Sequence, residues 1–164
     1  AAKAVTLRLA STEAFRTFAA RVVENARALA RGLERRGFHI VTGGTDTHIV
    51  LLDLRDREVS GTEAQARLEE AGLTANRNTV PFDPRGPEDP SGLRLGTTAL
   101  TGRGFDPEEM DPLAGLIHDV LSSHGDARRI RGARSRVLEL CRLHPLHVDR
   151  LEAAATGDNV RDPL

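Results

Sequence analysis

The 164-residue chain has no tryptophan, no tyrosine and a single cysteine, Cys141. One cysteine cannot form a disulfide within the chain, so the disulfide framework of small secreted domains is excluded and a reducing cytoplasm is the expected compartment. Apolar runs stay short of the ~18 residues that a membrane span requires, and no signal-peptide pattern is present. We therefore expect a cytoplasmic protein that does not associate with membranes.

Basic residues are almost all of one kind, because Lys3 is the only lysine beside 22 arginines. Acidic and basic residues are interspersed and give a net charge of -1, which predicts no binding to nucleic acid. The six histidines form no ligand set, because Pro145 separates His144 from His147 and no acid or cysteine joins them at a suitable spacing. Cys141 falls on the apolar side of a predicted helix, which is typical of a core residue.

Helical periodicity and turn-forming residues predict an alternation of helices and strands. Apolar residues recur at steps of three and four from Phe15 to Leu33, so a long helix is predicted for residues 11–36, ended by Gly37. Thr62 and Gln65 form a capping box in front of a shorter helix. The remaining expectations are a helix-prone segment at 1–10, strands at 38–42, 48–54, 73–76 and 93–95, a hairpin turn at 43–47, a proline-stiffened loop at 80–90, and helices at 62–71, 106–125 and 126–143.

This order of elements predicts an α/β fold in which one sheet is covered by helices. We expect a linking segment and long helix at residues 1–36, followed by a domain at 37–146. Periodicity is lost in the last part of the chain, so residues 147–164 are expected to form a frayed tail.

One short alternating segment, Leu93-Arg94-Leu95, stands inside a stretch that is otherwise dense in turn-formers. Neighbouring residues of a strand point to opposite faces, so the leucines can enter a core while Arg94 faces the other way. A guanidinium fixed on a strand between glycines is suited to binding a planar carboxylate. The spacing alone favours the simpler reading, an arginine on a solvated sheet face.

Three motifs in this region, NRNTVPFDP, PSGLRLGT and ALTGRGF, resemble in order and spacing the carboxy-terminal region of serine hydroxymethyltransferase. The similarity runs from AAKAV at Ala1, through VTGGTDTHIVLLDLR, to VLELCRLHPL near Leu146. It implies the small carboxy-terminal domain of a fold-type I transferase that uses pyridoxal phosphate (PLP) and tetrahydrofolate to interconvert serine and glycine, as a homodimer when complete. By this resemblance, Arg94 binds the carboxylate of the substrate amino acid and Asn78 contacts the folate ring.

The resemblance also implies that the groups holding PLP lie outside this chain. Covalent attachment of PLP needs a lysine amine, and Lys3 does not stand at the family's position, so we expect the chain alone to be inactive. Two alternatives stay open: a folate-independent PLP aldolase or transaldolase of the same fold, and a truncated, non-catalytic interaction domain. Thr98 replaces the family's usual proline, and Glu88 and Asp89 place acids where they would compete for the charge of Arg94.

Overall fold

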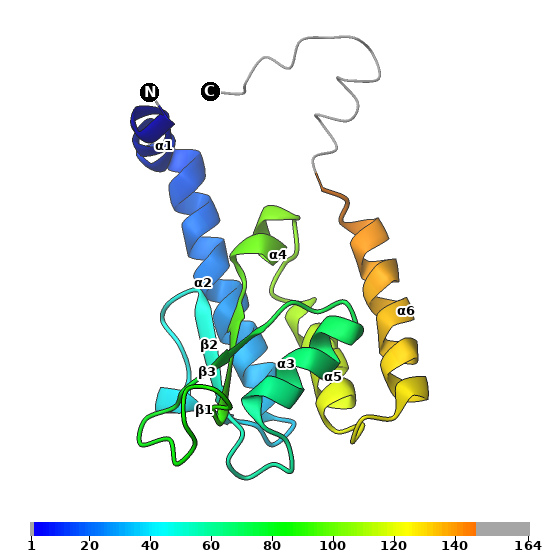
Figure 1. Cartoon of the computed structure of the whole chain (residues 1–164). Helices are drawn as coiled ribbons and strands as arrows, with labels where there is room; N and C mark the ends of the chain where they lie inside the picture. The colour runs from blue at the N-terminus through cyan, green and yellow to red at the C-terminus, as the bar shows by residue number, and fades with distance from the viewer. Residues whose placement is uncertain (1, 147–164) are drawn as a thin grey trace.

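A computed structural model describes residues 2–146 of the chain (Figure 1). The tail expected at residues 147–164 lies outside the described residues. No helix within residues 2–146 is both long and apolar enough to cross a membrane. The elements, in chain order, are α1 (Ala2–Ala10), α2 (Glu13–Glu34), β1 (His39–Ile40), a 3-10 turn η1 (Val41–Gly43), β2 (Ile49–Asp53), α3 (Gly61–Glu70), β3 (Asn76–Asn78), β4 (Gly92–Gly96), α4 (Thr98–Gly102), α5 (Met110–Leu121) and α6 (Ala127–Leu143).

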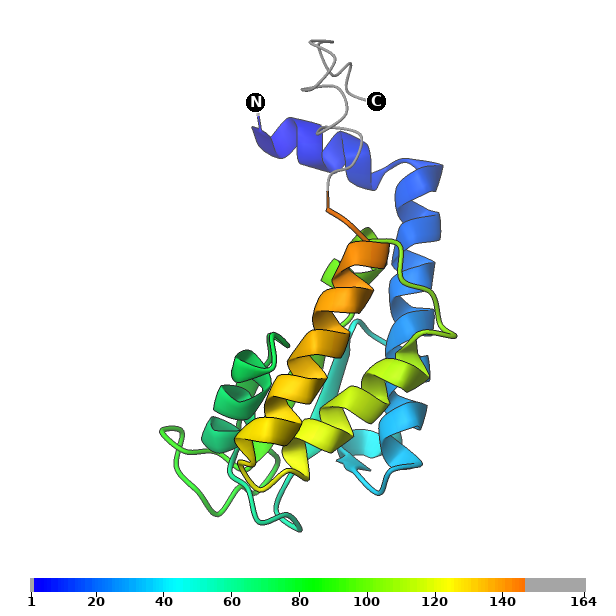
Figure 2. The ribbon, with the colours of Figure 1, turned by 90° about the vertical axis from the view of Figure 1, so that its right-hand side faces the viewer.

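The four strands form one antiparallel sheet in the order β1-β2-β4-β3, so β4 lies in the interior of the sheet. Figure 2 shows α5 and α6 in front of the sheet, with α2 and α3 on either side of them. Side chains that point toward these helices are buried, among them Val50, Leu52, Leu93 and Leu95. The predicted α/β fold, with one sheet covered by helices, is confirmed.

Helices α2 and α5 are in close contact because Gly32 has no side chain. A Cβ at Gly32 would lie 2.8 Å from the Ala114 Cβ. At the same crossing, Asp111 accepts hydrogen bonds from Arg35 Nη2 at 2.7 Å and from Arg36 Nη1 at 2.6 Å. The guanidinium groups of Arg36 and Arg35 hold the pKa of Asp111 well below its usual range, so this carboxylate stays charged and joins the two helices.

The long helix is confirmed, but only its second half belongs to the core. Its predicted apolar stripe is buried from Val22 to Leu33, whereas Phe15 is 43% exposed. Figure 1 shows α1 and the first turns of α2 extending beyond the sheet and the other helices. This end of the molecule therefore presents apolar side chains to solvent, with Leu7 71% exposed as well.

Several local predictions were wrong in position. Ser60, not Thr62, caps α3: its side chain accepts from the Glu63 backbone, and Glu63 Oε2 accepts in return from Ser60 N at 3.1 Å. The strand predicted for residues 73–76 lies instead at Asn76–Asn78, because Leu73 follows the turn that ends α3.

Other differences concern the length of elements. The first strand has only two residues because the chain turns at once into η1, where Thr42 adopts a positive φ of 70°. Helix α4 was missed, since Gly96 and Gly102 enclose too short a segment for a periodic pattern. The helix predicted for 106–125 begins at Met110 and ends at Leu121, and in front of it Asp106 and Glu109 exchange reciprocal backbone-to-side-chain hydrogen bonds.

Candidate functional site

The face of the sheet opposite the helices carries the residues that the sequence singled out. We call it the open face, and it consists of the side chains on strands β1, β2, β4 and β3 that point away from α2, α3, α5 and α6. Strand pairing places Arg94 opposite Leu51 on one side and opposite Asn76 on the other. Directly paired residues of antiparallel strands point to the same face, so Arg94 stands in the middle of the open face.

Arg94 is exposed, whereas its neighbours Leu93 and Leu95 are buried. The alternation expected from the sequence is therefore confirmed. Within residues 2–146, the guanidinium of Arg94 has no hydrogen-bonded or acidic partner, and the alternation of burial along β4 directs it away from the core. The open face thus presents a charged group with five donors on a hydrogen-bonded strand, without any group in the described chain that neutralises it.

Asn78 lies on the same face as Arg94. It pairs with Gly92, two residues before Arg94, so the two side chains are diagonal neighbours at about 7–8 Å. The amide nitrogen of Asn78 donates to the Thr79 carbonyl at 2.7 Å, which fixes the orientation of the amide. The two predicted site residues are therefore close together on adjacent strands.

The glycines around Arg94 have different roles. A Cβ at Gly92 would lie 2.5 Å from the Asn78 carbonyl oxygen and 2.6 Å from Val80 Cγ1, so only glycine fits at this position. Gly96 is open, with His48 O as the nearest atom at 3.9 Å from a built Cβ. Gly92 therefore allows the close approach of β3 that brings Asn78 beside Arg94.

The loop between these two strands is closed by one carboxylate, Asp83, that the sequence did not reveal. Asp83 Oδ2 accepts from Val80 N at 3.2 Å and from Ser91 N at 2.9 Å, and Asp83 Oδ1 accepts from Ser91 Oγ at 2.7 Å and from Arg85 N at 3.0 Å. Burial acts to raise the pKa of Asp83, but the hydrogen bonds from Ser91, Arg85 and Val80 outweigh it and hold the pKa well below its usual range.

Asp83 thus connects Val80, just after β3, with Ser91, just before β4. The local signal for this role was the FDPR turn, in which an aspartate before proline commonly accepts hydrogen bonds from nearby backbone. Phe82, beside it in the chain, adopts a positive φ of 57° and is 98% exposed.

The acids of this loop do not compete for Arg94. Asp89 Oδ2 pairs with Arg85 Nη1 at 3.0 Å, and hydroxyl groups of Ser60 and Thr62 contribute to lowering the pKa of Asp89. The carbonyl of Glu88 accepts from Thr62 Oγ1 at 3.4 Å. The loop is therefore fastened to the start of α3, and within the described residues its acids form no ion pair with Arg94.

A second charged group lies on the neighbouring strand β2, where Asp53 is a diagonal neighbour of Arg94, as Asn78 is on β3. Asp53, also paired with Gly92, is only 5% exposed and accepts from Arg55 Nε at 3.0 Å through both oxygens. The hydrogen bond from Arg55 lowers the pKa of Asp53. This pair satisfies its own charges, which leaves Arg94 as the guanidinium on this face available to a ligand.

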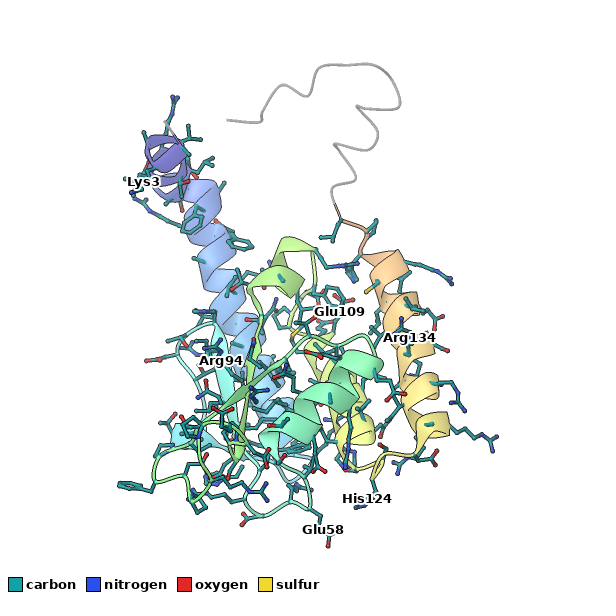
Figure 3. All side chains as sticks on the ribbon, in the orientation of Figure 1. Lys3, Glu58, Arg94, Glu109, His124 and Arg134 are labelled. Atoms are coloured by element: carbon teal, nitrogen blue, oxygen red, sulfur yellow. The ribbon has the colours of Figure 1, made fainter. Side chains whose placement is uncertain are left out.

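Residues 2–146 offer neither a lysine placed for covalent attachment of PLP (Figure 3) nor a cluster of metal ligands. Lys3 lies on α1, well away from Arg94 (Figure 3), so it does not fit a covalent link to a cofactor placed at the open face. Groups of three or more His, Cys, Asp or Glu side chains arranged to hold a metal ion are absent from residues 2–146. The residues present fit a carboxylate through Arg94 and a polar ring through Asn78 and Asn76, but they do not fit covalent attachment of PLP.

Behind β4, on its helix side, lies an apolar cavity of about 240 Å³. It is lined by Leu95 of β4 and by side chains of α2, α3, α4, α5 and α6, including Leu100 and Cys141, and Arg103 is also part of its lining. Arg103 Nε donates to the His144 carbonyl at 2.9 Å, and His144 Nε2 lies 2.6 Å from Glu109 Oε1. Cys141 is half-buried here, as expected for a packing residue.

Comparison with known proteins identifies the family of this chain. The sequence model of the family described as serine hydroxymethyltransferase matches residues 1–117. A serine hydroxymethyltransferase of Sorangium cellulosum (strain So ce56) is 47% identical over 145 residues, which cover 88% of this chain and 34% of that protein. The chain spans about a third of the length of this curated relative. Matches over most of its length show that the chain belongs to the serine hydroxymethyltransferase family.

Proposed function

We propose that this chain is the carboxy-terminal part of a serine hydroxymethyltransferase and that its open face binds the carboxylate of serine or glycine. The observation that carries the proposal is Arg94, an exposed guanidinium on an interior strand without an acidic partner in residues 2–146. Family membership supports the reaction class, and the exposed position of Arg94 on β4 supports its role in binding a carboxylate.

A carboxylate suits this position for physical reasons. The planar guanidinium offers two parallel N–H donors to the two oxygens of a carboxylate, and such charge-assisted bonds are short and directional. Because Arg94 lies where β4 is paired with β2 on one side and with β3 on the other, its backbone has little freedom, and few conformations need to be lost on binding. Leu51, half-buried beside it, offers an apolar wall that would lower the local dielectric once the face is covered.

Asn78 is proposed to contact the ring of tetrahydrofolate. An amide offers both a donor and an acceptor, as the edge of a pteridine ring does, so the two can pair. The bond from its own nitrogen to Thr79 O orients the amide, and the fixed Asn78–Gly92 pairing holds it near Arg94. In this arrangement the amino acid and the folate would be bound by adjacent strands of one sheet.

PLP, when bound, supplies the electron-withdrawing ring that allows the bonds at the α-carbon of the amino acid to break. We propose that the rest of the protein and a second subunit of a homodimer hold it, because Lys3 does not fit that role. This chain then orients the amino acid through its carboxylate, and it excludes water when the open face is covered.

The test uses the complete protein that contains this chain. Purified enzyme is given L-serine with and without tetrahydrofolate, and glycine and the one-carbon product are measured. We expect serine cleavage that depends on folate. Cleavage of β-hydroxy amino acids that is indifferent to folate would identify an aldolase instead, and absence of turnover with PLP present would identify an interaction domain.

A further inference from the structure

We propose that α6 is a docking surface for the phosphate backbone of double-stranded nucleic acid. The helix has 17 residues, of which six are arginines and one, Glu139, is acidic, so its net charge is about +5. The whole chain carries 23 basic and 24 acidic residues, which leaves 17 and 23, or about -6, outside α6. The charges that look interspersed along the sequence are therefore segregated in space.

The arginines of α6 are exposed, and most of their charge is not neutralised. Arg136 lies 3.7 Å from Asp119, and Arg129 and Arg134 each donate to a main-chain carbonyl at 2.9 Å. Arg128, Arg131 and Arg142 are exposed and form no ion pair within the described residues. Figure 2 shows α6 along the front of the molecule, and no described segment lies over its outer side.

The free arginines form a row. Positions 128, 131 and 142 are separated by 3 and 11 residues, close to one and three turns, so they share the outer side of the helix. The row extends over about 21 Å at 1.5 Å per residue. Double-stranded DNA carries one charge per about 1.7 Å of its axis, so several phosphates lie within reach of this row.

Other polyanions fit this surface less well. A helix that binds an anionic membrane inserts an apolar face, but the apolar face of α6, with Ile130, Ala133 and Val137, is buried in the core. Single strands are held by stacking on aromatic side chains, and α6 has none. Protein interfaces usually have an apolar centre, whereas the exposed Leu138 and Leu143 of α6 stand singly among charges.

The experiment compares two variants of the full chain with equal charge. One carries Arg128→Gln, Arg131→Gln and Arg142→Gln on α6, and the other carries Arg16→Gln, Arg21→Gln and Arg31→Gln on α2, where Arg16 and Arg21 already pair with glutamates. Gln keeps the helix propensity of Arg, and circular dichroism confirms that both variants are folded. Binding to a fluorescent 20-base-pair DNA duplex and to an RNA duplex is measured by anisotropy between 50 and 200 mM salt.

We expect the α6 variant to bind the duplexes at least about tenfold more weakly at 50 mM salt. The slope of log K against log salt concentration should be smaller in magnitude by about 2–3, since each lost phosphate contact removes about 0.9 from it. The α2 variant should stay within about threefold of the unaltered chain. Equal loss in both variants would reduce the effect to net charge and overturn the proposal. No binding by the unaltered chain, or tighter binding to poly-aspartate or to vesicles of anionic lipid than to a duplex, would also overturn it.

Discussion

Replacing Arg94 by alanine in the complete protein tests the proposed site most directly. If two parallel N–H donors hold the substrate carboxylate, their loss removes contacts of roughly 1.5–3 kcal/mol each. We predict that kcat/KM for serine falls at least about a hundredfold, near 2.7 kcal/mol. Arg94→Lys should recover little, because an ammonium group cannot reproduce the planar pair of donors.

The same substitution should leave the fold nearly unchanged. Arg94 is exposed and has no partner within residues 2–146, so its removal should alter the free energy of unfolding by less than about 1 kcal/mol. Arg77, also exposed but on the preceding strand and on the opposite face, is the matched control, and Arg77→Ala should leave kcat/KM within a few-fold. Steady-state kinetics and urea midpoints are measured on the same preparations. Near-normal kinetics with a collapsed midpoint would show that Arg94 is structural and that the proposal is wrong.

Three further predictions follow from the same structure. Asn78→Ala should raise the KM for tetrahydrofolate about two- to twelvefold, the value of one neutral hydrogen bond, while the KM for serine changes less; an unchanged folate response would favour the aldolase. The chain alone, treated with PLP and borohydride, should gain no stoichiometric adduct on Lys3 by mass spectrometry, and full labelling would contradict its exclusion. Asp83→Asn should lower the thermal midpoint at pH 7, and because the folded-state pKa is depressed from its ordinary 3.8, the difference from the unaltered chain should shrink as the pH falls below about 4; a difference as large at pH 2 as at pH 7 would refute the role of the charge.

The long-range features that the sequence predicted depend on periodic burial. Helices α2 and α6 show their apolar stripes over many turns, and the alternation around Arg94 records one buried and one exposed face. Such patterns survive small local rearrangements, so element type was predicted well. A helix cap is harder to place from sequence, because Ser60 and Thr62 are each followed three residues later by a side chain that can complete a capping box. The structure places the cap at Ser60, where the next residue, Gly61, lies against the Gly92 and Pro90 carbonyls.

The candidate site was predicted only in part, because strand register is not written in a local pattern. Asn78 and Arg94 are 16 residues apart, and their proximity depends on the pairing of Asn78 with Gly92. That pairing requires the absence of a side chain at Gly92 and the closure of the loop by Asp83, two features that act across the loop. The resemblance to the family pointed to the two residues, and the structure adds the reason that they lie together.

The exposure of Arg94 has a consequence for how the proposed site works. A guanidinium and a carboxylate that meet in water gain only about 0–1 kcal/mol, whereas even millimolar affinity requires about 4 kcal/mol. The chain alone should therefore show no saturable binding of serine in calorimetry, although Arg94 is present and correctly oriented. The larger value assumed for the complete enzyme arises only when other parts of the protein cover the open face and exclude water. Substrate binding and assembly would then depend on the same surface, and saturable, Arg94-dependent binding of serine by the chain alone would refute this coupling.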